Sequence, residues 1–263
     1  MNRQRRILVM VLSALALAGP GSAGEARTGS GAADADAACG APPDLLEAGA
    51  QLPATARAVG AGGLRVVVVG SASVLGPGTS GPAAAWPARL EALLGGRFPG
   101  LSIETTVRGA PGLAATDSVA MLRDELRRTR PHLVVWQTGA VEAARNMDLD
   151  ELAATLDEGL RAAEAAGADA VLMDPQFSRV LRANANIEPY LDAMRLAAAA
   201  HSAPLIRRYE LMHAWAESER VDLERAPKSA RVAVADRLND CIARAAAAVV
   251  ADGVEQGKAQ ALP

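Results

Sequence analysis

The sequence predicts an α/β fold with a mainly parallel sheet that helices cover on both faces. From Leu64 onward, short and continuously apolar runs such as VVVV at 66–69 alternate with longer amphipathic segments. Apolar runs without polar alternation are typical of strands buried on both faces, and helices between them supply the crossovers that parallel strands need. At 263 residues and 50% hydrophobic content, the chain is long enough for one sizeable core.

The elements of the first half are predicted from turn and capping residues. Pro87 suits the first turn of a helix and Gly95 its end, and Thr116 or Asp117 can cap the next helix. We therefore expect an ordered arm at 39–53, a strand at 65–69, a helix at 86–94, a strand at 101–107, a helix that ends at Thr129 and a strand at 133–137.

In the second half, Asp148 is suited to cap a long amphipathic helix that ends at Gly167. Residues 153–200 are rich in alanine, which favours helix rather than low-complexity disorder. The remaining predicted elements are a strand at 170–174, helices at 188–201 and 209–219 on either side of a short strand at 204–206, and a last helix at 236–252.

The N-terminal residues predict export. Three arginines precede an apolar run of twelve residues at 7–18, and the small residues at 21–23 suit a signal peptidase. The apolar run is too short to span a bilayer comfortably, so we expect a signal peptide at 1–23 rather than an uncleaved anchor. The rest divides into a disordered lead-in at 24–37, one domain at 38–255 and a C-terminal tail at 256–263. In a Gram-negative bacterium the compartment would be the periplasm.

The charge balance argues against nucleic-acid partners. The full chain carries a net charge of −3, and loss of the signal peptide with its three arginines lowers this to −6. The mature sequence has no basic cluster of the kind that binds phosphates. No later apolar run reaches the length of a membrane span, so we expect no stable membrane insertion after cleavage.

The candidate site consists of the residues that follow the predicted strands. In parallel α/β sheets, ligands bind at the carboxyl ends of the strands. The candidate pocket residues at these positions are Ser71, Ser73, Arg108, Gly109, Thr138, Gly139, Glu142, Asp174 and Gln176.

Five sequence blocks, in this order, resemble the SGNH (GDSL-like) hydrolases. They are GSAS at 70–73, RGAPG at 108–112, LVVWQTGAVEA at 133–143, VLMDPQ at 171–176 and ADRLNDCIARA at 235–245. The chain is most similar to an exported bacterial branch whose first block reads like GSSSTAG. The resemblance spans about residues 39–250. It implies a flavodoxin-like three-layer α/β/α sandwich and hydrolysis of ester or acyl bonds by a Ser–His–Asp triad with an oxyanion hole.

The resemblance also locates the reactive positions, and two of the first three are replaced. The nucleophile position, second after Gly70, is Ala72, which has no oxygen with which to attack. The glycine that gives an oxyanion-hole amide is retained as Gly109, but the asparagine position holds Val141. Loss of one such donor removes about 2.7–4 kcal/mol of transition-state stabilisation.

The last block lacks the acid and the base. Aligned on Cys241, the family's Asp and His fall on Ala230 and Ala233; aligned on Ala226-Pro227, they fall on Lys228 and Arg231. The chain's three histidines are His132, His201 and His213, so none follows position 213. The triad imidazole is therefore missing in either register.

We therefore expect no catalysis, and a non-catalytic binding or accessory role toward acylated glycans or a small ester-like ligand. One alternative is an active esterase that uses Ser73 or Ser71 as a displaced nucleophile. Another is a structural module that binds a protein partner. Ser73 has no local base, so its expected role is to cap the following turn, and Ser71 is expected to form a hydrogen bond.

We expect no cofactor and no metal. GPGTSG at 76–81 matches the glycine pattern of dinucleotide-binding loops, but its first glycine follows the strand by six residues, and Pro77 and Pro82 stiffen the loop. The histidines lack the spacing of metal ligands.

The chain has two cysteines, Cys39 and Cys241. In an oxidising compartment an even pair favours a disulfide, which would join the N-terminal arm to the start of the last helix. Two buried free thiols are the alternative.

Overall fold

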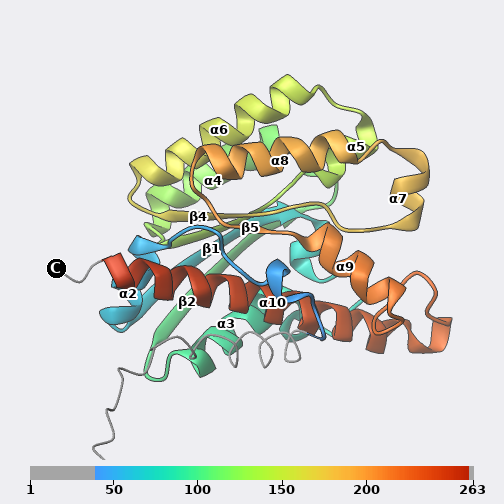
Figure 1. The fold of residues 1–263 in the computed structure, drawn as a ribbon, viewed down its shortest axis with the longest axis horizontal. Helices are drawn as coiled ribbons and strands as arrows, with labels where there is room; N and C mark the ends of the chain where they lie inside the picture. The colour runs from blue at the N-terminus through green and yellow to red at the C-terminus, as the bar shows by residue number, and fades with distance from the viewer. Residues whose placement is uncertain (1–38, 261–263) are drawn as a thin grey trace, which may run out of the picture.

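A computed structural model describes residues 39–260, which form a three-layer α/β/α sandwich (Figure 1). The central sheet has five parallel strands in the order β2-β1-β3-β4-β5, which is the order of flavodoxin-like folds. The strands are β1 (Gly63–Ser71), β2 (Ser102–Ala110), β3 (Leu133–Gln137), β4 (Asp169–Met173) and β5 (Leu205–Ile206). The predicted fold class is confirmed.

Helices cover both faces of this sheet. One face carries α2 (Pro53–Gly60), α3 (Trp86–Arg97) and α10 (Arg231–Gln260); the other carries α4 (Ala115–Thr129), α6 (Leu149–Ala165) and α8 (Glu188–Ala200). Three further helices, α5 (Ala140–Arg145), α7 (Arg179–Asn184) and α9 (Arg208–Glu217), follow the carboxyl ends of β3, β4 and β5 and lie toward the right of Figure 1. The single turns of 3-10 helix are Pro43–Leu45, Ala72–Leu75, Pro82–Ala84 and Lys228–Ala230.

The four valines of β1 fill both halves of the core. Val66 and Val68 belong to the apolar cluster beneath α2, α3 and α10, whereas Val67 and Val69 belong to the cluster beneath α4, α6 and α8. All four are at most 2% exposed. This alternation is the reason that the strand reads as an unbroken apolar run.

Several predicted strand and helix boundaries need correction. β1 and β2 pair from Gly63 with Ser102 to Ser71 with Ala110, so both strands are longer than the predicted 65–69 and 101–107. β4 ends at Met173, one residue before the predicted end. α3 continues through Gly95 and Gly96 to Arg97, since each glycine costs a helix only about 1 kcal/mol.

The cap of α4 is also different from the prediction. The helix starts at Ala115, and neither Thr116 nor Asp117 caps it. Instead the carboxylate of Glu142, which is distant in sequence, accepts a hydrogen bond from the Ala115 amide. The predicted cap of α6 is confirmed, because Asp148 Oδ1 accepts a hydrogen bond of 2.9 Å from the Glu151 amide.

The last helix is much longer than the predicted 236–252. Residues 256–260, which we expected in a C-terminal tail, form the end of α10. Gly253 and Gly257 lie against Leu52, which immediately precedes α2, and a Cβ built on Gly253 would be 2.8 Å from Leu52 Cγ. The absence of a side chain at these two glycines therefore permits close packing of the arm on this helix.

Short elements were not predicted. They are α2, α5 and α7, which have 8, 6 and 6 residues. Within residues 39–260, no helix is long and apolar enough to cross a membrane. The expected signal peptide at 1–23 and the lead-in at 24–37 lie outside the described residues.

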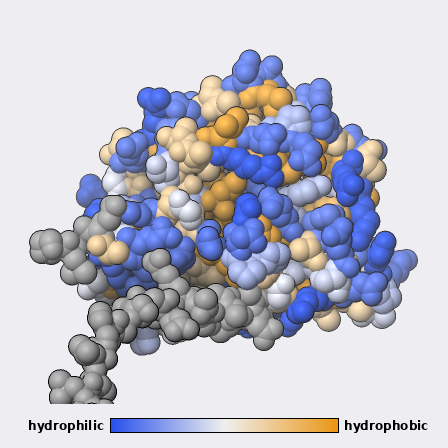
Figure 2. Space-filling model, viewed as in Figure 1, coloured by the Kyte–Doolittle hydropathy of each residue, from blue (hydrophilic) through white to orange (hydrophobic). Residues whose placement is uncertain are grey.

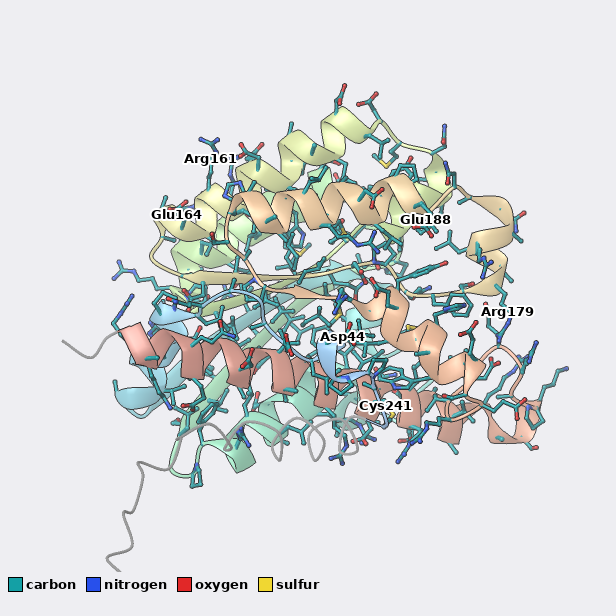
Figure 3. The ribbon with its side chains drawn as sticks, viewed as in Figure 1. Asp44, Arg161, Glu164, Arg179, Glu188 and Cys241 are labelled. Carbon is teal, nitrogen blue, oxygen red and sulfur yellow. A yellow bond between two sulfur atoms is a disulfide. The ribbon has the colours of Figure 1, made fainter. Side chains whose placement is uncertain are left out.

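A disulfide joins Cys39 to Cys241, as predicted, with the Cα atoms 5.6 Å apart. The two residues are 4% and 0% exposed. Because α10 begins at Arg231, Cys241 lies inside the helix and not at its start. Figure 3 shows Cys241 on α10 where the N-terminal arm crosses that helix. The bond therefore fixes the arm to the middle of the last helix.

Replacing both cysteines with alanine should lower the free energy of unfolding by about 2–5 kcal/mol, because the bond closes a long loop in the unfolded chain. The sequence separation is 202 residues. Urea unfolding of the mature protein measures the loss. Reduction should destabilise the wild type by a similar amount and leave the double variant unchanged. Equal stability of the two oxidised proteins would contradict the prediction.

Candidate functional site

The turn after β1 packs closely on the end of β2. The side chain of Val74 lies over Gly70 and Gly109, which pair across the two strands. A Cβ built on Gly109 would lie 2.3 Å from Val74 Cγ2, and one built on Gly70 would lie 2.8 Å from Val74 Cγ1. A side chain at either position would displace the turn at Ala72–Leu75, which carries Val74. The two glycines therefore hold this turn close to the sheet.

Gln137, the last residue of β3, joins the two serines of this turn. Ser73 Oγ donates a hydrogen bond of 2.7 Å to Gln137 Oε1, and Gln137 Nε2 donates one of 3.1 Å to Ser71 Oγ. Gln137 is 2% exposed. Ser71 thus forms a hydrogen bond, as expected. We expected Ser73 to cap the turn that follows, and this expectation is wrong. Its hydroxyl is directed to the neighbouring strand instead.

A buried cation contacts the same serine. Arg208, the first residue of α9, is 3% exposed, and its Nη1 donates to Ser73 Oγ at 3.2 Å. Its Nη2 donates to Gln176 Oε1 at 3.1 Å. Within residues 39–260, its Nε has no hydrogen-bond partner. Burial lowers the pKa of this guanidinium to about 10, so it is still charged at neutral pH.

Asp174, the first residue after β4, is fully buried near this arginine. Its Oδ1 accepts a hydrogen bond of 2.8 Å from the Tyr209 amide in the first turn of α9. Its Oδ2 has no partner in the described part of the chain. Burial raises the pKa of the carboxyl from 3.8 to about 7, while the Tyr209 amide and the charge of Arg208 oppose that rise only in part.

Ser73, Gln176 and Arg208 line a cavity of about 190 Å³ at this edge of the sheet. Other lining residues are mostly apolar and include Trp86, Phe177, Met212, Leu238 and Ile242.

Charged residues line the more exposed side of the cavity. Arg179 pairs with Asp222 at 2.9 Å and with Glu224 at 3.4 Å, and all three line the cavity. Figure 3 shows Arg179 at the start of α7, beside the segment that follows α9. The Ser178 hydroxyl donates a further hydrogen bond of 2.6 Å to Glu224. The acidic groups at this side are therefore already paired with groups of the protein.

The other predicted pocket residues lie elsewhere. Glu142 accepts hydrogen bonds from the Gly139 amide at 2.8 Å and from Thr138 Oγ1 at 3.2 Å, and it caps α4. Arg108 forms a salt bridge of 2.6 Å with Glu125 on α4. Of the nine predicted pocket residues, Ser73 and Gln176 line the cavity. Ser71 bonds to Gln137 behind the cavity, and Asp174 is buried beside Arg208. The remaining five do not line the cavity; they are Arg108, Gly109, Thr138, Gly139 and Glu142.

The positions that align with the family's reactive groups are not among the residues that line the cavity beside Ser73. Ala72 begins the turn after β1, and Val141 is half-buried in α5. Ala230 is half-buried before α10, and Ala233 is exposed on its first turn. Ala233 lines a separate surface hollow.

The histidines have other partners. His132 Nδ1 accepts a hydrogen bond of 3.1 Å from the Arg65 amide, His201 pairs with Asp157 at 3.0 Å, and His213 pairs with Glu217 at 3.2 Å. In the described chain, the only hydrogen-bond partners of the Ser73 hydroxyl are Gln137 and Arg208. No imidazole is therefore placed to take its proton.

Two residues of the site, Gln137 and Arg208, were not predicted from the sequence. A polar residue at the end of a buried apolar strand is a signal that could have identified Gln137. Arg208 has no comparable signal, because it follows a second arginine. Arg207 is 30% exposed in its side chain and pairs with Asp44 on the arm, and adjacent positions in the sequence do not reveal which arginine is buried.

The residues around the other end of the sheet form a larger, open hollow of about 970 Å³. One of its four acidic lining residues, Asp169, already accepts hydrogen bonds from the amides of Ala54 and Thr55, at 3.2 and 2.7 Å. Among residues 39–260, no group of three His, Cys, Asp or Glu side chains is arranged to hold a metal ion.

Comparison with known proteins gives one family and a consistent fold. The model of the non-GDSL lipase-like family matches residues 38–256. No curated protein sequence matches the chain.

Similar solved structures are hydrolases. LAE5, an alpha/beta hydrolase enzyme from the metagenome of Lake Arreo, is 20% identical with a TM-score of 0.55, over 71% of this chain and 95% of that one. TesA is 20% identical with a TM-score of 0.53, over 68% and 95%. A catalytic mutant of Axe2, an acetylxylan esterase from Geobacillus stearothermophilus, is 16% identical with a TM-score of 0.52, over 66% and 91%. At these identities the likeness concerns the fold.

The raised pKa of Asp174 predicts a specific pH dependence of stability. Between pH 3.8 and about 7 the unfolded chain releases this proton while the folded chain keeps it, so stability falls as the pH rises. The full displacement corresponds to roughly 4 kcal/mol. Asp174→Asn keeps an acceptor for the Tyr209 amide and cannot ionise, so the wild type should lose stability relative to this variant over that range.

Urea unfolding at a series of pH values measures the difference. Asp150→Asn, at an exposed position of α6, is the matched control and should follow the wild type. If the wild type and Asp174→Asn changed in parallel from pH 4 to 8, the buried carboxyl would have to be ionised throughout.

Proposed function

We propose that this chain, which belongs to the non-GDSL lipase-like family, is an exported binding protein that does not catalyse hydrolysis. Its ligand occupies the cavity beside Ser73. The observation that carries the proposal is the environment of the hydroxyl at this position. Ser73 donates to an amide oxygen of Gln137 and accepts from the cation of Arg208, and neither partner can take its proton.

The absence of a nucleophile at the family position supports the same conclusion. Ala72 offers a methyl group where the resembled family has a serine, and Val141 offers none of the hydrogen-bond donors of an asparagine. Nucleophile, base and one oxyanion donor are thus missing together. A cavity with polar and apolar lining remains, which is the usual composition of a small-molecule site.

An acylated glycan or another ester-like molecule is the proposed class of ligand. The apolar walls of the cavity suit an acyl group, and Axe2, a structure of similar fold, is an acetylxylan esterase. Export is supported by the signal-like residues at 1–23 and by the disulfide, since such bonds persist in oxidising compartments.

An active esterase that uses Ser73 is the second candidate. In its favour, Ser73 lines the cavity and Arg208 could stabilise a negative oxygen. Ser71 is a weaker candidate, because it accepts from Gln137 and does not line the cavity. Either serine would still need a base.

A structural module that binds a protein partner has less support. Figure 2 shows hydrophobic residues interspersed with hydrophilic ones over the face in view. The large hydrophobic residues that are exposed within residues 39–260 come from separate segments; they are Leu75, Leu149, Val180, Leu196 and Val232. So few exposed side chains of this kind offer little of the apolar surface that marks many protein interfaces.

Purified protein should not hydrolyse p-nitrophenyl acetate above the rate of the buffer, because no base activates a serine. Fluorophosphonate probes should leave the protein unlabelled. Ser73→Ala is the matched variant and should behave as the wild type in both assays. Turnover in the wild type that Ser73→Ala abolishes would establish the esterase instead.

Restoring the nucleophile alone should not restore hydrolysis. Ala72→Ser places a hydroxyl at the family position, but a serine without a base is a weak nucleophile. We expect its rate with p-nitrophenyl acetate to equal that of the wild type and of Ala233→Ser, a control at an exposed position of α10. Strong activity of Ala72→Ser alone would show that a base is present.

A further inference from the structure

We propose that the cavity beside Ser73 binds a small carboxylate, whose anionic group is held by Arg208 and whose hydrocarbon part fills the apolar walls. This proposal rests on the proposed binding function, and it replaces the ester-like ligand proposed above with a free carboxylate. The relevant features are the donors of Arg208, the composition of the walls, and the size of the cavity.

The guanidinium of Arg208 has more donors than partners. An arginine carries five N–H groups, and the structure gives Arg208 two hydrogen bonds, to Ser73 and Gln176. Both partners are neutral. Within residues 39–260, Nε has no partner, although the side chain is 3% exposed. A buried cation with unmet donors is unfavourable unless an anion meets it, and a carboxylate offers two oxygens that match the guanidinium fork.

Asp174 does not fill that role. Although its charge acts on Arg208, no hydrogen bond joins the two side chains, and its Oδ1 is engaged by the Tyr209 amide. Asp174 also does not line the cavity, whereas Arg208 does. An incoming anion would therefore meet Arg208 without displacing a protein carboxylate from it.

Among residues 39–260, the more exposed side of the cavity supplies no second unpaired cation. Arg179 is held by Asp222 and Glu224, and Asp222 also lies 3.8 Å from Arg225. The charges on this side are thus balanced between two acids and two bases. A single available cation at the inner end fits a monoanion such as a carboxylate better than a doubly charged phosphate.

The walls and the volume set the rest of the ligand. Trp86, Phe177, Met212, Leu238 and Ile242 offer apolar surface to a hydrocarbon chain. The cavity measures about 190 Å³. A cavity of about 150 Å³ can hold benzene, so this one has room for about six to eight non-hydrogen atoms. Carboxylates of about four to six carbons have that size.

The test is calorimetric titration of the purified mature protein with acetate, butyrate, hexanoate and decanoate. Affinity should rise from acetate to hexanoate, reach the millimolar range or better, and fall for decanoate, which exceeds the cavity. Hexanamide, which has the same shape but no charge, should bind at least about tenfold more weakly, as expected for loss of a charge-assisted contact. Equal binding of hexanoate and hexanamide would overturn the role assigned to Arg208.

Two variants locate the site. Arg208→Met should reduce hexanoate affinity by at least about tenfold, while Arg108→Met, which removes an arginine at the same sheet edge but outside the cavity, should leave it unchanged. Because loss of Arg208 can also disturb folding, Ala216→Leu provides an independent test. Ala216 lines the cavity at 5% exposure, so the larger side chain fills space there while Arg208 stays.

Ala216→Leu should abolish hexanoate binding. Its near-UV circular dichroism spectrum should match that of the wild type, which shows that the variant is folded. Unchanged binding in that folded variant would overturn the proposal by showing that carboxylates bind elsewhere, and absence of carboxylate binding by the wild type would overturn it directly. Neither result would show that the protein hydrolyses esters. If the proposed non-catalytic function were wrong, the sign would be serine-dependent turnover of esters. Failure of the carboxylate proposal and failure of the proposed function are therefore distinguishable.

Discussion

The burial of one positive charge, the guanidinium of Arg208, determines how the strand ends are arranged. A cation removed from water must be surrounded by acceptors of the protein or pair with an anion. The turn after β1 supplies the Ser73 hydroxyl, and the segment after β4 supplies the Gln176 side chain. Because these acceptors come from different strands, the same charge holds the turn after β1 and the segment after β4 against the start of α9.

The start of α9 also explains the position of Asp174. The first amides of a helix have no partners within the helix, and an acceptor is favourable there. Asp174 Oδ1 accepts from the Tyr209 amide in this first turn. An aspartate that follows a strand and resembles part of a functional motif therefore has a structural role as well. Asp174 Oδ2 has no partner within residues 39–260. Burial of the carboxyl is the cause of the raised pKa of Asp174.

The same contacts separate this site from a hydrolytic one. A nearby cation can stabilise a serine oxygen, but a nucleophile also requires a group that accepts the proton. The proton of Ser73 is directed at the Oε1 atom of the Gln137 amide, which is not basic. Within residues 39–260, the Ser73 hydroxyl thus contacts a strong hydrogen-bond donor but no basic group, an arrangement suited to holding a negative group and not to generating an alkoxide.

The sequence predicted the fold better than it predicted the site. Runs such as VVVV at 66–69 indicate buried strands regardless of distant residues. The resemblance of the five motif blocks to a known family implies the flavodoxin-like sandwich. The cap of α4 by Glu142 and the continuation of α10 past Gly253 depend on contacts between residues far apart in the chain, which local patterns do not encode. For the same reason nothing in the sequence distinguishes buried Arg208 from its neighbour Arg207.

The disulfide has a consequence for the cavity that its place in the sequence conceals. Cys241 lies on α10 between residues that line the cavity, Asn239 and Ile242. The side chain of Asn239 is also fixed, because its Oδ1 accepts a hydrogen bond of 3.0 Å from the Trp86 amide, and Trp86 lines the cavity from α3. The covalent bond that ties the N-terminal arm to α10 therefore also limits the movement of one wall. A wall ordered before the ligand arrives lowers the entropic cost of binding, so the stability of the domain and the preorganisation of its cavity depend on the same bond.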